Sequence, residues 1–232
     1  MKISLIPSIE YVDRIDLKGK VAVVIDVLRA TSVIITALSN GAKEVVATTE
    51  IDETFKLKNN NSIIGGERKA LKINGFDLSN SPLEYQENIV RGKRVILNTT
   101  NGTKAINKCS DGAYVFIGGI INGKAVSKKI AEIGKDVVFV CSGTDGKFSL
   151  DDYICAGKII YNLLEIKNGE LEDLAATAYM AYRDNKGDLF SYVKMASHYK
   201  YMISIGLEED IEYCFQEDIV DIVPEVKNGK II

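Results

Sequence analysis

One segment, residues 21–41, constrains the fold most; it reads VAVVIDVLRATSVIITALSNG. Its first five residues are apolar and mostly β-branched, which predicts a strand that is buried on both faces. An apolar helix follows and ends at Asn40-Gly41, where glycine suits a left-handed C-terminal cap. Asp26, Arg29 and Thr31 stand between the strand and the helix. Open α/β sheets bind ligands at this edge and helix N-termini attract anions, so we expect a binding site; the alternative is a capping aspartate with a surface ion pair.

The same strand–loop–helix unit recurs along the 232-residue chain. Short buried strands are expected near residues 44–48, 94–97, 114–117 and 136–140, with helices between them, which predicts an α/β fold with largely parallel sheets. The pattern of residues 38–46 also resembles that of residues 109–116. This match favours an internal duplication, although the strand–loop–helix pattern common to all α/β proteins could produce it too.

We therefore expect one domain over residues 1–232, built from two similar, intertwined α/β/α lobes. The lobes would span about residues 1–92 and 93–165 and face a shared cleft that holds the site. The helices and strands of residues 166–232 would pack on both lobes, and a hairpin would turn at Asn228-Gly229.

Composition excludes several classes of protein. A net charge of -3 without a basic cluster argues against a nucleic-acid partner. No apolar run approaches the ~18 residues of a membrane span. The first residues are too short and polar a stretch for a signal peptide, and four widely spaced cysteines favour reduced thiols, so a cytoplasmic location is expected. The single histidine, His198, excludes histidine clusters, so we expect the chemistry to rest on carboxylates, hydroxyls, amides, lysine and arginine.

Three predicted strand-end loops each supply one acid: Asp26, Glu67 and Asp145. Three oxygen ligands without histidine suit a hard cation such as Mg²⁺. The loop at residues 98–103, NTTNGT, is rich in side-chain donors, and its glycine would let backbone N–H groups approach an anion. Helix capping by Thr100 or Asn101 is the alternative interpretation of this loop.

Cys141 begins the segment CSGTDGK, which superficially resembles the phosphate-binding loop of the cysteine phosphatases. That loop needs an arginine fork on the phosphate, whereas this chain has Lys147 there. A cysteine that ends a buried strand is most often a packing residue. We expect Cys141 to pack in the core, and a nucleophilic thiolate is the alternative.

Four motifs in order, IDVLRATSVIITAL, GGERKALKINGFDLSNSPLEY, LNTTNGTKAI and VCSGTDGKFSLDDYICAG, together resemble the 2-phosphosulfolactate phosphatase (ComB) family. The resemblance implies Mg²⁺-dependent hydrolysis of 2-phosphosulfolactate to sulfolactate and phosphate, a reaction of sulfonate metabolism and coenzyme M biosynthesis. It also implies a fold of two intertwined α/β lobes. This chain departs from the family at Lys69-Ala70, where related sequences commonly have glycines.

Motif by motif, the resemblance and the loops give a predicted site for a small phosphorylated acid, with Mg²⁺ as cofactor. The predicted catalytic residues are Asp26, Arg29, Arg68 and Asp145, and the predicted metal ligands are Asp26, Glu67 and Asp145. The predicted substrate-binding residues are Thr31, Asp77, Asn80, Ser81, Asn98, Thr99, Thr100, Asn101, Gly102, Thr103, Ser142, Gly143 and Thr144.

Several alternatives stay open at this point. A non-catalytic binder of phosphorylated acids would keep the anion-binding loops, and a Mg²⁺ phosphatase could act on another phosphorylated two- or three-carbon acid. Attack by water and attack by an aspartate, with Asp26 as the first candidate, are both compatible with the motifs. A homodimer is a further expectation.

Overall fold

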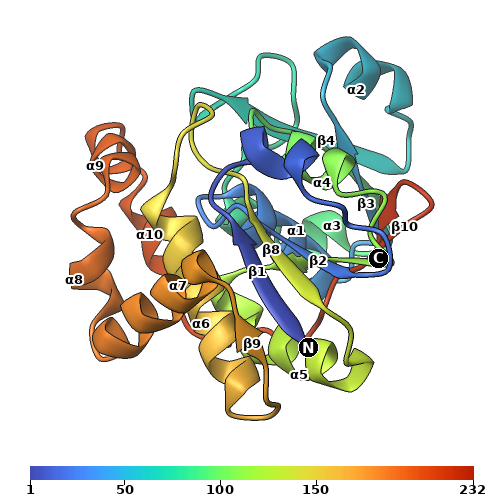
Figure 1. Cartoon of the computed structure of the whole chain (residues 1–232). Coiled ribbons are helices and arrows are strands. Elements are labelled where there is room, and N and C mark those ends of the chain that lie inside the picture. The colour runs from blue at the N-terminus through green and yellow to red at the C-terminus, as the bar shows by residue number, and fades with distance from the viewer.

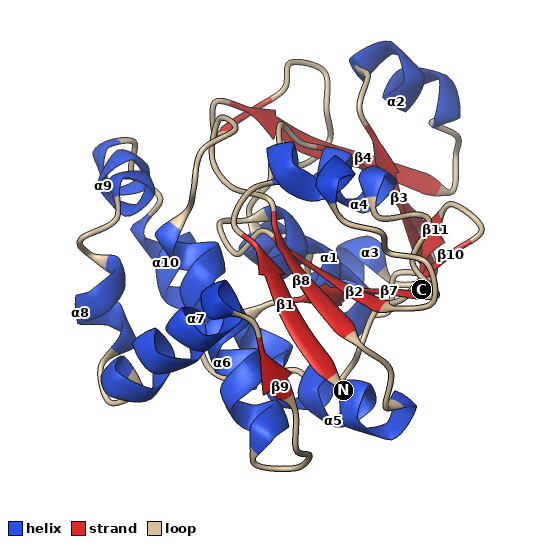
Figure 2. Cartoon of the chain, viewed as in Figure 1, coloured by secondary structure: helices blue, strands red, loops and turns tan.

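In the computed structural model the chain forms two β-sheets with helices around and between them (Figures 1 and 2). The structure describes residues 1–13 and 15–232 in full, and only the backbone of Arg14. The first sheet has the strand order β7-β2-β8-β1-β9, and all its neighbouring strands are parallel. These strands are β1 (Lys2–Ile6), β2 (Val21–Ile25), β7 (Tyr114–Gly118), β8 (Val137–Cys141) and β9 (Glu170–Leu171).

The second sheet has the order β10-β11-β3-β6-β4-β5. Its centre is parallel and consists of β3 (Glu44–Thr48), β6 (Arg94–Asn98) and β4 (Ser62–Arg68). Antiparallel strands form its edges: β5 (Leu71–Lys72), β10 (Val226–Lys227) and β11 (Lys230–Ile231). The predicted α/β class with largely parallel sheets is therefore confirmed, as is the hairpin turn at Asn228-Gly229.

Strand β2 shows why the first sheet lies at the centre of the molecule. Val21, Val23 and Ile25 pack in one apolar cluster with α5 (Gly123–Ile133) and α6 (Leu150–Leu164). The alternate residues of β2, Ala22 and Val24, pack in a second cluster that extends to α1 (Ala30–Ser39) and the second sheet. Fully burying a valine or isoleucine stabilises the fold by about 1.5–3 kcal/mol, so this strand is a major source of stability.

The helices lie around the sheets as Figures 1 and 2 show: α5, α6 and α7 (Asp173–Asn185) lie together beside the first sheet, whereas α2 (Ile51–Leu57) lies near β3 and β4. The remaining helices are α3 (Glu87–Val90), α4 (Gly102–Lys108), α8 (Leu189–Val193), α9 (Ser197–Ser204) and α10 (Glu208–Cys214), with 3-10 turns at Ile9–Arg14, Pro82–Glu84 and Ile120–Asn122. Within the described residues, no helix combines the length and apolar character needed to cross a membrane.

The structure changes the expected division of the chain. Each sheet takes strands from both halves, so a boundary between residues 92 and 93 does not separate the two sheets. Strand β4 extends to Arg68, so Glu67, which was predicted in a strand-end loop, lies on a strand. The internal duplication stays a prediction.

Candidate active site

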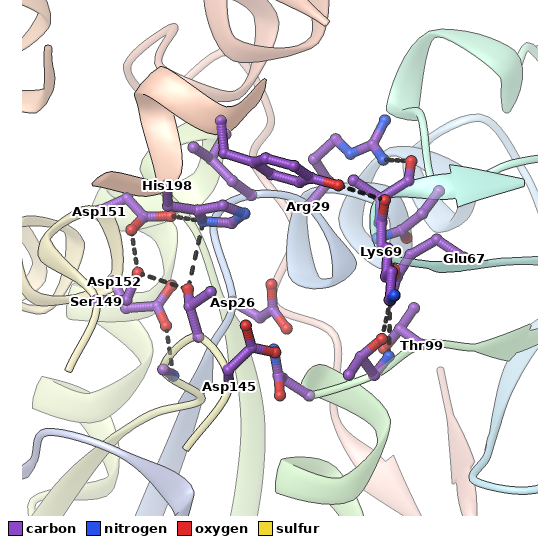
Figure 3. A pocket seen from close by; sticks show the side chains of 18 of the residues that line it. Asp26, Arg29, Glu67, Lys69, Thr99, Asp145, Ser149, Asp151, Asp152 and His198 are labelled. Carbon is purple, nitrogen blue, oxygen red and sulfur yellow. Dashed lines mark hydrogen bonds and ion pairs between the residues drawn. The ribbon is translucent and has the colours of Figure 1, made fainter. Parts of the chain in front are cut away.

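The carboxyl ends of strands from both sheets meet at a cavity of about 640 Å³ (Figure 3). Pockets of this size hold small-molecule ligands. Loops after β2, β6 and β8 line it, together with the turn between β4 and β5 and with helix α9. The predicted site residues that line the cavity are Asp26, Arg29, Glu67, Arg68, Asn80, Thr99, Thr100, Asn101, Gly143, Thr144 and Asp145.

Asp26 follows β2 directly, and hydrogen bonds to its backbone N–H and carbonyl groups fix its position at the cavity. The Thr31 hydroxyl donates to the Asp26 carbonyl at 2.9 Å and accepts from the Asp26 N–H at 3.2 Å. Of the carboxylate oxygens, Oδ1 accepts one long bond from the Ala30 N–H at 3.4 Å, and Oδ2 has no hydrogen-bond partner among the described residues. A Cβ at Gly102 would lie 2.7 Å from Oδ2, so only glycine fits beside this carboxylate.

Burial raises the pKa of Asp26 to about 7, because a charged carboxylate is poorly solvated there. A buried acid with an oxygen that lacks a partner is therefore available to a cation or to a proton. The first turn of α1 does not offer its free N–H groups to an external anion, since Ala30 and Thr31 both donate to Asp26.

Glu67 has a different environment. Its Oε1 accepts from the Thr100 N–H at 2.7 Å and from the Thr100 hydroxyl at 2.8 Å, and its Oε2 accepts from the Ala70 N–H at 2.8 Å. The carboxylate thus ties the β4–β5 turn to the loop after β6. Its lone pairs are largely occupied by these donors, which leaves Glu67 a weaker candidate for a metal ligand than Asp26.

The predicted three-carboxylate metal site is not preformed. Among the described residues, no group of three or more His, Cys, Asp or Glu side chains is placed to hold a metal ion. Three oxygen-bearing groups at the cavity still lack partners among those residues: Asp26 Oδ2, the exposed Asp145 carboxylate, and the buried Oδ1 of Asn80. Mg²⁺ usually binds one or two carboxylates and otherwise keeps water and substrate oxygens, so this donor set fits Mg²⁺.

The two predicted arginines line the cavity, but protein groups already engage them. Arg29 is buried, forms an ion pair with Asp210 of α10, and donates to the Ala70 carbonyl at 2.7 Å. Arg68 donates to the Asn98 side chain at 2.6 Å and to the Glu67 carbonyl at 2.7 Å. Both guanidinium groups therefore hold the walls of the cavity together.

Other predicted binding residues lie behind the cavity wall and position it. The Thr103 hydroxyl donates to the Thr99 carbonyl at 2.9 Å, and the Thr103 N–H, in the first turn of α4, donates to the Thr99 hydroxyl at 3.2 Å. Asn98 donates to the hydroxyls of Thr48 and Thr54 at 3.1 and 3.0 Å. The predicted residues that do not line the cavity are Thr31, Asp77, Ser81, Asn98, Gly102, Thr103 and Ser142.

Two of these predictions need correction. Ser81, predicted to bind substrate, does not line the cavity, and its hydroxyl donates to Asp210. Asp77 is exposed, where it pairs with Lys58 at 2.7 Å and accepts from the Ile64 N–H at 3.0 Å. Its role in this structure is to close the loop after β4.

Sequence reasoning missed an acidic pair at the start of α6. Asp152 accepts from the backbone N–H groups of Val27 at 2.9 Å and Gly143 at 3.0 Å, so it joins the loops after β2 and β8. Burial raises its pKa well above the usual value. Asp151 accepts from the Ser149 hydroxyl and lies 3.3 Å from His198. The only signal was two adjacent acids after a strand-end loop, which also fits an ordinary helix start.

His198 lies in the cavity, although the sequence argument gave it no role (Figure 3). Its Nδ1 is 3.3 Å from Asp151 Oδ2 and 3.5 Å from the Thr144 hydroxyl. Burial alone would lower the pKa of His198, but the hydrogen bond and charge of Asp151 outweigh burial and raise it above 6.5. For Asp151, burial would raise the pKa, and the bond and charge of His198 lower it instead.

The four cysteines are free and buried. Cys141 ends β8 inside the apolar cluster beneath α6, and burial raises the pKa of its thiol well above 9.0. It does not line the cavity. These facts support the packing role of Cys141 and argue against a nucleophilic thiolate.

Comparison with known proteins agrees with the motifs. The family described as "2-phosphosulpholactate phosphatase" matches residues 8–229. Full-length relatives named "probable 2-phosphosulfolactate phosphatase" include one from Clostridium beijerinckii, 52% identical over all of this chain and 99% of the relative. Another, from Clostridium acetobutylicum, is 49% identical over the whole of both chains. This chain belongs to the 2-phosphosulfolactate phosphatase family of phosphoric monoester hydrolases.

Proposed function

We propose that this protein hydrolyses 2-phosphosulfolactate, or a closely related phosphorylated hydroxy acid, with Mg²⁺ as cofactor. The names of its full-length relatives support the reaction and the substrate. The observation that carries the proposal is the carboxylate of Asp26, which is buried at the cavity with an oxygen that has no partner among the described residues. A cytoplasmic location, a role in coenzyme M biosynthesis and a homodimer stay predictions.

The charges that line the cavity support the need for a cation. Carboxylates are in excess over cationic groups, and one cation, Arg29, is already paired with Asp210. A divalent ion bound to the carboxylates would add positive charge beside a phosphate dianion at this wall. The acids are Asp26, Glu67, Asp145, Asp151 and Asp152, and the basic residues are Arg29, Arg68, Lys69 and His198.

In this proposal Asp26 and Asp145 hold the metal, with the Asn80 side-chain oxygen as a further donor. Bound Mg²⁺ would neutralise charge on the phosphoryl group and fix its orientation. Lys69 is exposed at the cavity and has no ion pair among the described residues, so it suits the carboxylate or sulfonate of the substrate. The hydroxyls of Thr99 and Thr144 and the amide of Asn101 complete the polar lining.

Phosphate release from a panel of phosphorylated two- and three-carbon acids, including 2-phosphosulfolactate, tests the proposal. Protein treated with EDTA should be inactive, and Mg²⁺ should restore turnover. Asp145→Asn should raise the Mg²⁺ concentration for half-maximal activity by about tenfold or more. Asp111→Asn, an exposed aspartate outside the cavity, is the matched control and should leave it unchanged.

Binding of these acids without phosphate release would favour the non-catalytic binder. Release that is unchanged by EDTA would contradict the Mg²⁺ part of the proposal. Efficient release from another acid, with none from 2-phosphosulfolactate, would replace the substrate.

A further inference from the structure

The pair formed by Asp151 and His198 is the part of the cavity that the proposed function leaves without a role. Asp151 lies in the first turn of α6, and His198 lies in the first turn of α9, 47 residues further along the chain. Asp151 is buried, and its Oδ1 accepts from the Ser149 hydroxyl while its Oδ2 faces the imidazole. The carboxylate is therefore fixed, and it in turn orients the ring (Figure 3).

Only one nitrogen of this ring is engaged. Nδ1 faces Asp151 at 3.3 Å and Thr144 at 3.5 Å, whereas Nε2 has no hydrogen bond among the described residues. Because His198 lines the cavity, Nε2 is the nitrogen available to a bound ligand. An imidazolium carries a proton on each nitrogen and can donate the one on Nε2 while Asp151 holds the other.

We propose that His198 is the general acid of the proposed hydrolysis and that Asp151 is its positioning residue. This inference rests on the phosphatase function proposed above. As the bond from the attacking oxygen to phosphorus forms, the bond from phosphorus to the ester oxygen breaks, and its electron pair stays on that oxygen. The Nε2 proton of His198 then neutralises the leaving alkoxide. When water attacks, one of its two protons stays on the phosphate product. The other is released to solvent, and His198 takes up a proton from solvent before the next turnover.

The neighbouring groups make His198 the suitable donor. Arginine and lysine hold their protons too tightly near neutral pH to serve as efficient acids. Both oxygens of Asp152 accept from backbone N–H groups, and Asp26 is assigned to the cation. The charged groups that act on His198 are Asp151 and Asp26, which favour the imidazolium, and Arg29, which opposes it.

The test compares two esters with different leaving groups, 2-phosphosulfolactate and 4-nitrophenyl phosphate. The first releases a poorly stabilised alkoxide that needs a proton, and the second releases a stabilised phenolate that does not. His198→Gln should lower kcat/KM for 2-phosphosulfolactate by about 10²–10³-fold and for 4-nitrophenyl phosphate by less than about tenfold. Asp151→Asn should show the same selectivity with a smaller loss. Lys200→Gln, an exposed neighbour on α9 outside the cavity, is the control and should change neither value.

Equal losses of His198→Gln with the two esters would show a structural role and overturn the proposal, as would unchanged turnover of 2-phosphosulfolactate. If the variant does not fold, the pH profile of the unaltered protein tests whether His198 is the general acid. Its kcat/KM with 2-phosphosulfolactate should fall at alkaline pH as His198 loses its proton, and a level profile would overturn the proposal. Absence of any phosphate release by the unaltered protein would instead show that the proposed function itself is wrong.

Discussion

The two walls of the cavity contain similar residue types but differ in how their polar groups are satisfied. On the wall from the second sheet, three donors bind the carboxylate of Glu67, and the Asn98 side chain accepts from Arg68. On the wall from the first sheet, Asp26 keeps an oxygen without a partner among the described residues, and burial raises its pKa to about 7. The difference indicates that the first wall holds the reactive groups and that the second wall fixes the shape of the cavity.

The walls are joined by the turn between β4 and β5. Arg29, from the loop after β2, donates to the Ala70 carbonyl at 2.7 Å. Tyr201, from α9, donates to the Lys69 carbonyl at 3.0 Å. The turn therefore belongs to the second sheet, but its position is fixed by the loop after β2 and by α9. The shape of the site thus depends on contacts between distant parts of the chain.

The largest effect is expected for Asp26→Asn. This change should lower kcat/KM by about 10²–10³-fold, because it keeps the shape of the side chain but removes the charge assigned to the metal. The free energy of unfolding should not fall, however. The pKa of Asp26 in the folded protein, about 7, lies above the ordinary 3.8, so the stability of the fold falls as the pH rises from 3.8 to about 7, and the full cost of the charged carboxylate is present above pH 7. At pH 8 in EDTA, the neutral amide should therefore unfold at an equal or higher denaturant concentration.

Phosphate release and urea unfolding of the same Asp26→Asn preparation separate the two effects. Near-normal turnover of Asp26→Asn at saturating Mg²⁺ would show that Asp26 is not a metal ligand. A loss of activity that merely follows a loss of stability would place Asp26 with the supporting residues, and the contrast between the walls would disappear.

The position of Asp26 could be predicted because strand, loop and helix are local in the sequence. An unbroken β-branched run fixes β2, and the residue that follows such a strand lies at the carboxyl edge of the sheet. The contacts between loops that lie far apart in the sequence were not predictable in the same way. Pairing of β2 with β8 lets Asp152 accept from Val27, the residue after Asp26, and from Gly143, whereas pairing of β4 with β6 brings Glu67 to Thr100. The expected lobe over residues 1–92 contains both Asp26 and Glu67, whereas Asp26 follows a strand of the first sheet and Glu67 lies on a strand of the second.

His198 could not be assigned from the sequence because its role depends on which helix covers the cavity. Residues 189–204 contain two short helices, α8 and α9, and α9 places His198 beside Asp151 of α6. A lone histidine has no spacing pattern that reports such a contact. His198 and Tyr201 are three residues apart and both line the cavity, but this signal becomes meaningful only after α9 is placed.

A second prediction concerns the supporting wall. Glu67→Gln should lower the free energy of unfolding by about 1–3 kcal/mol, because the new amide N–H group would face backbone or hydroxyl donors that now bind a carboxylate oxygen. The loss of activity should be smaller than that of Asp26→Asn. Thermal unfolding should shift down by about 2–4 °C per kcal/mol for a chain of this size. Glu212→Gln, on the exposed face of α10, is the control and should stay within about 0.5 kcal/mol.

Together, Asp26→Asn and Glu67→Gln test whether the first wall carries the chemistry and the second wall supports the shape of the cavity. If Glu67→Gln abolished turnover without destabilising the fold, Glu67 would be a metal ligand after all. Calorimetric titration with Mg²⁺ would then show binding to the unaltered protein and not to the variant.

The smallest effect is expected at the turn that joins the walls. Lys69 and Ala70 have φ angles of 52° and 60°, the left-handed conformation that both central residues of such a two-residue hairpin require. A side chain in this conformation costs roughly 1–2 kcal/mol relative to glycine, so Ala70→Gly should stabilise the fold by about 1 kcal/mol. Ala47→Gly in β3, an extended strand, is the matched control and should destabilise by about 0.5–1 kcal/mol. Opposite shifts in the urea midpoint would show that Ala70 is strained in its left-handed conformation, and parallel losses would show that it is not. Turnover should change little in Ala70→Gly, because the carbonyl groups that Arg29 and Tyr201 bind stay in place.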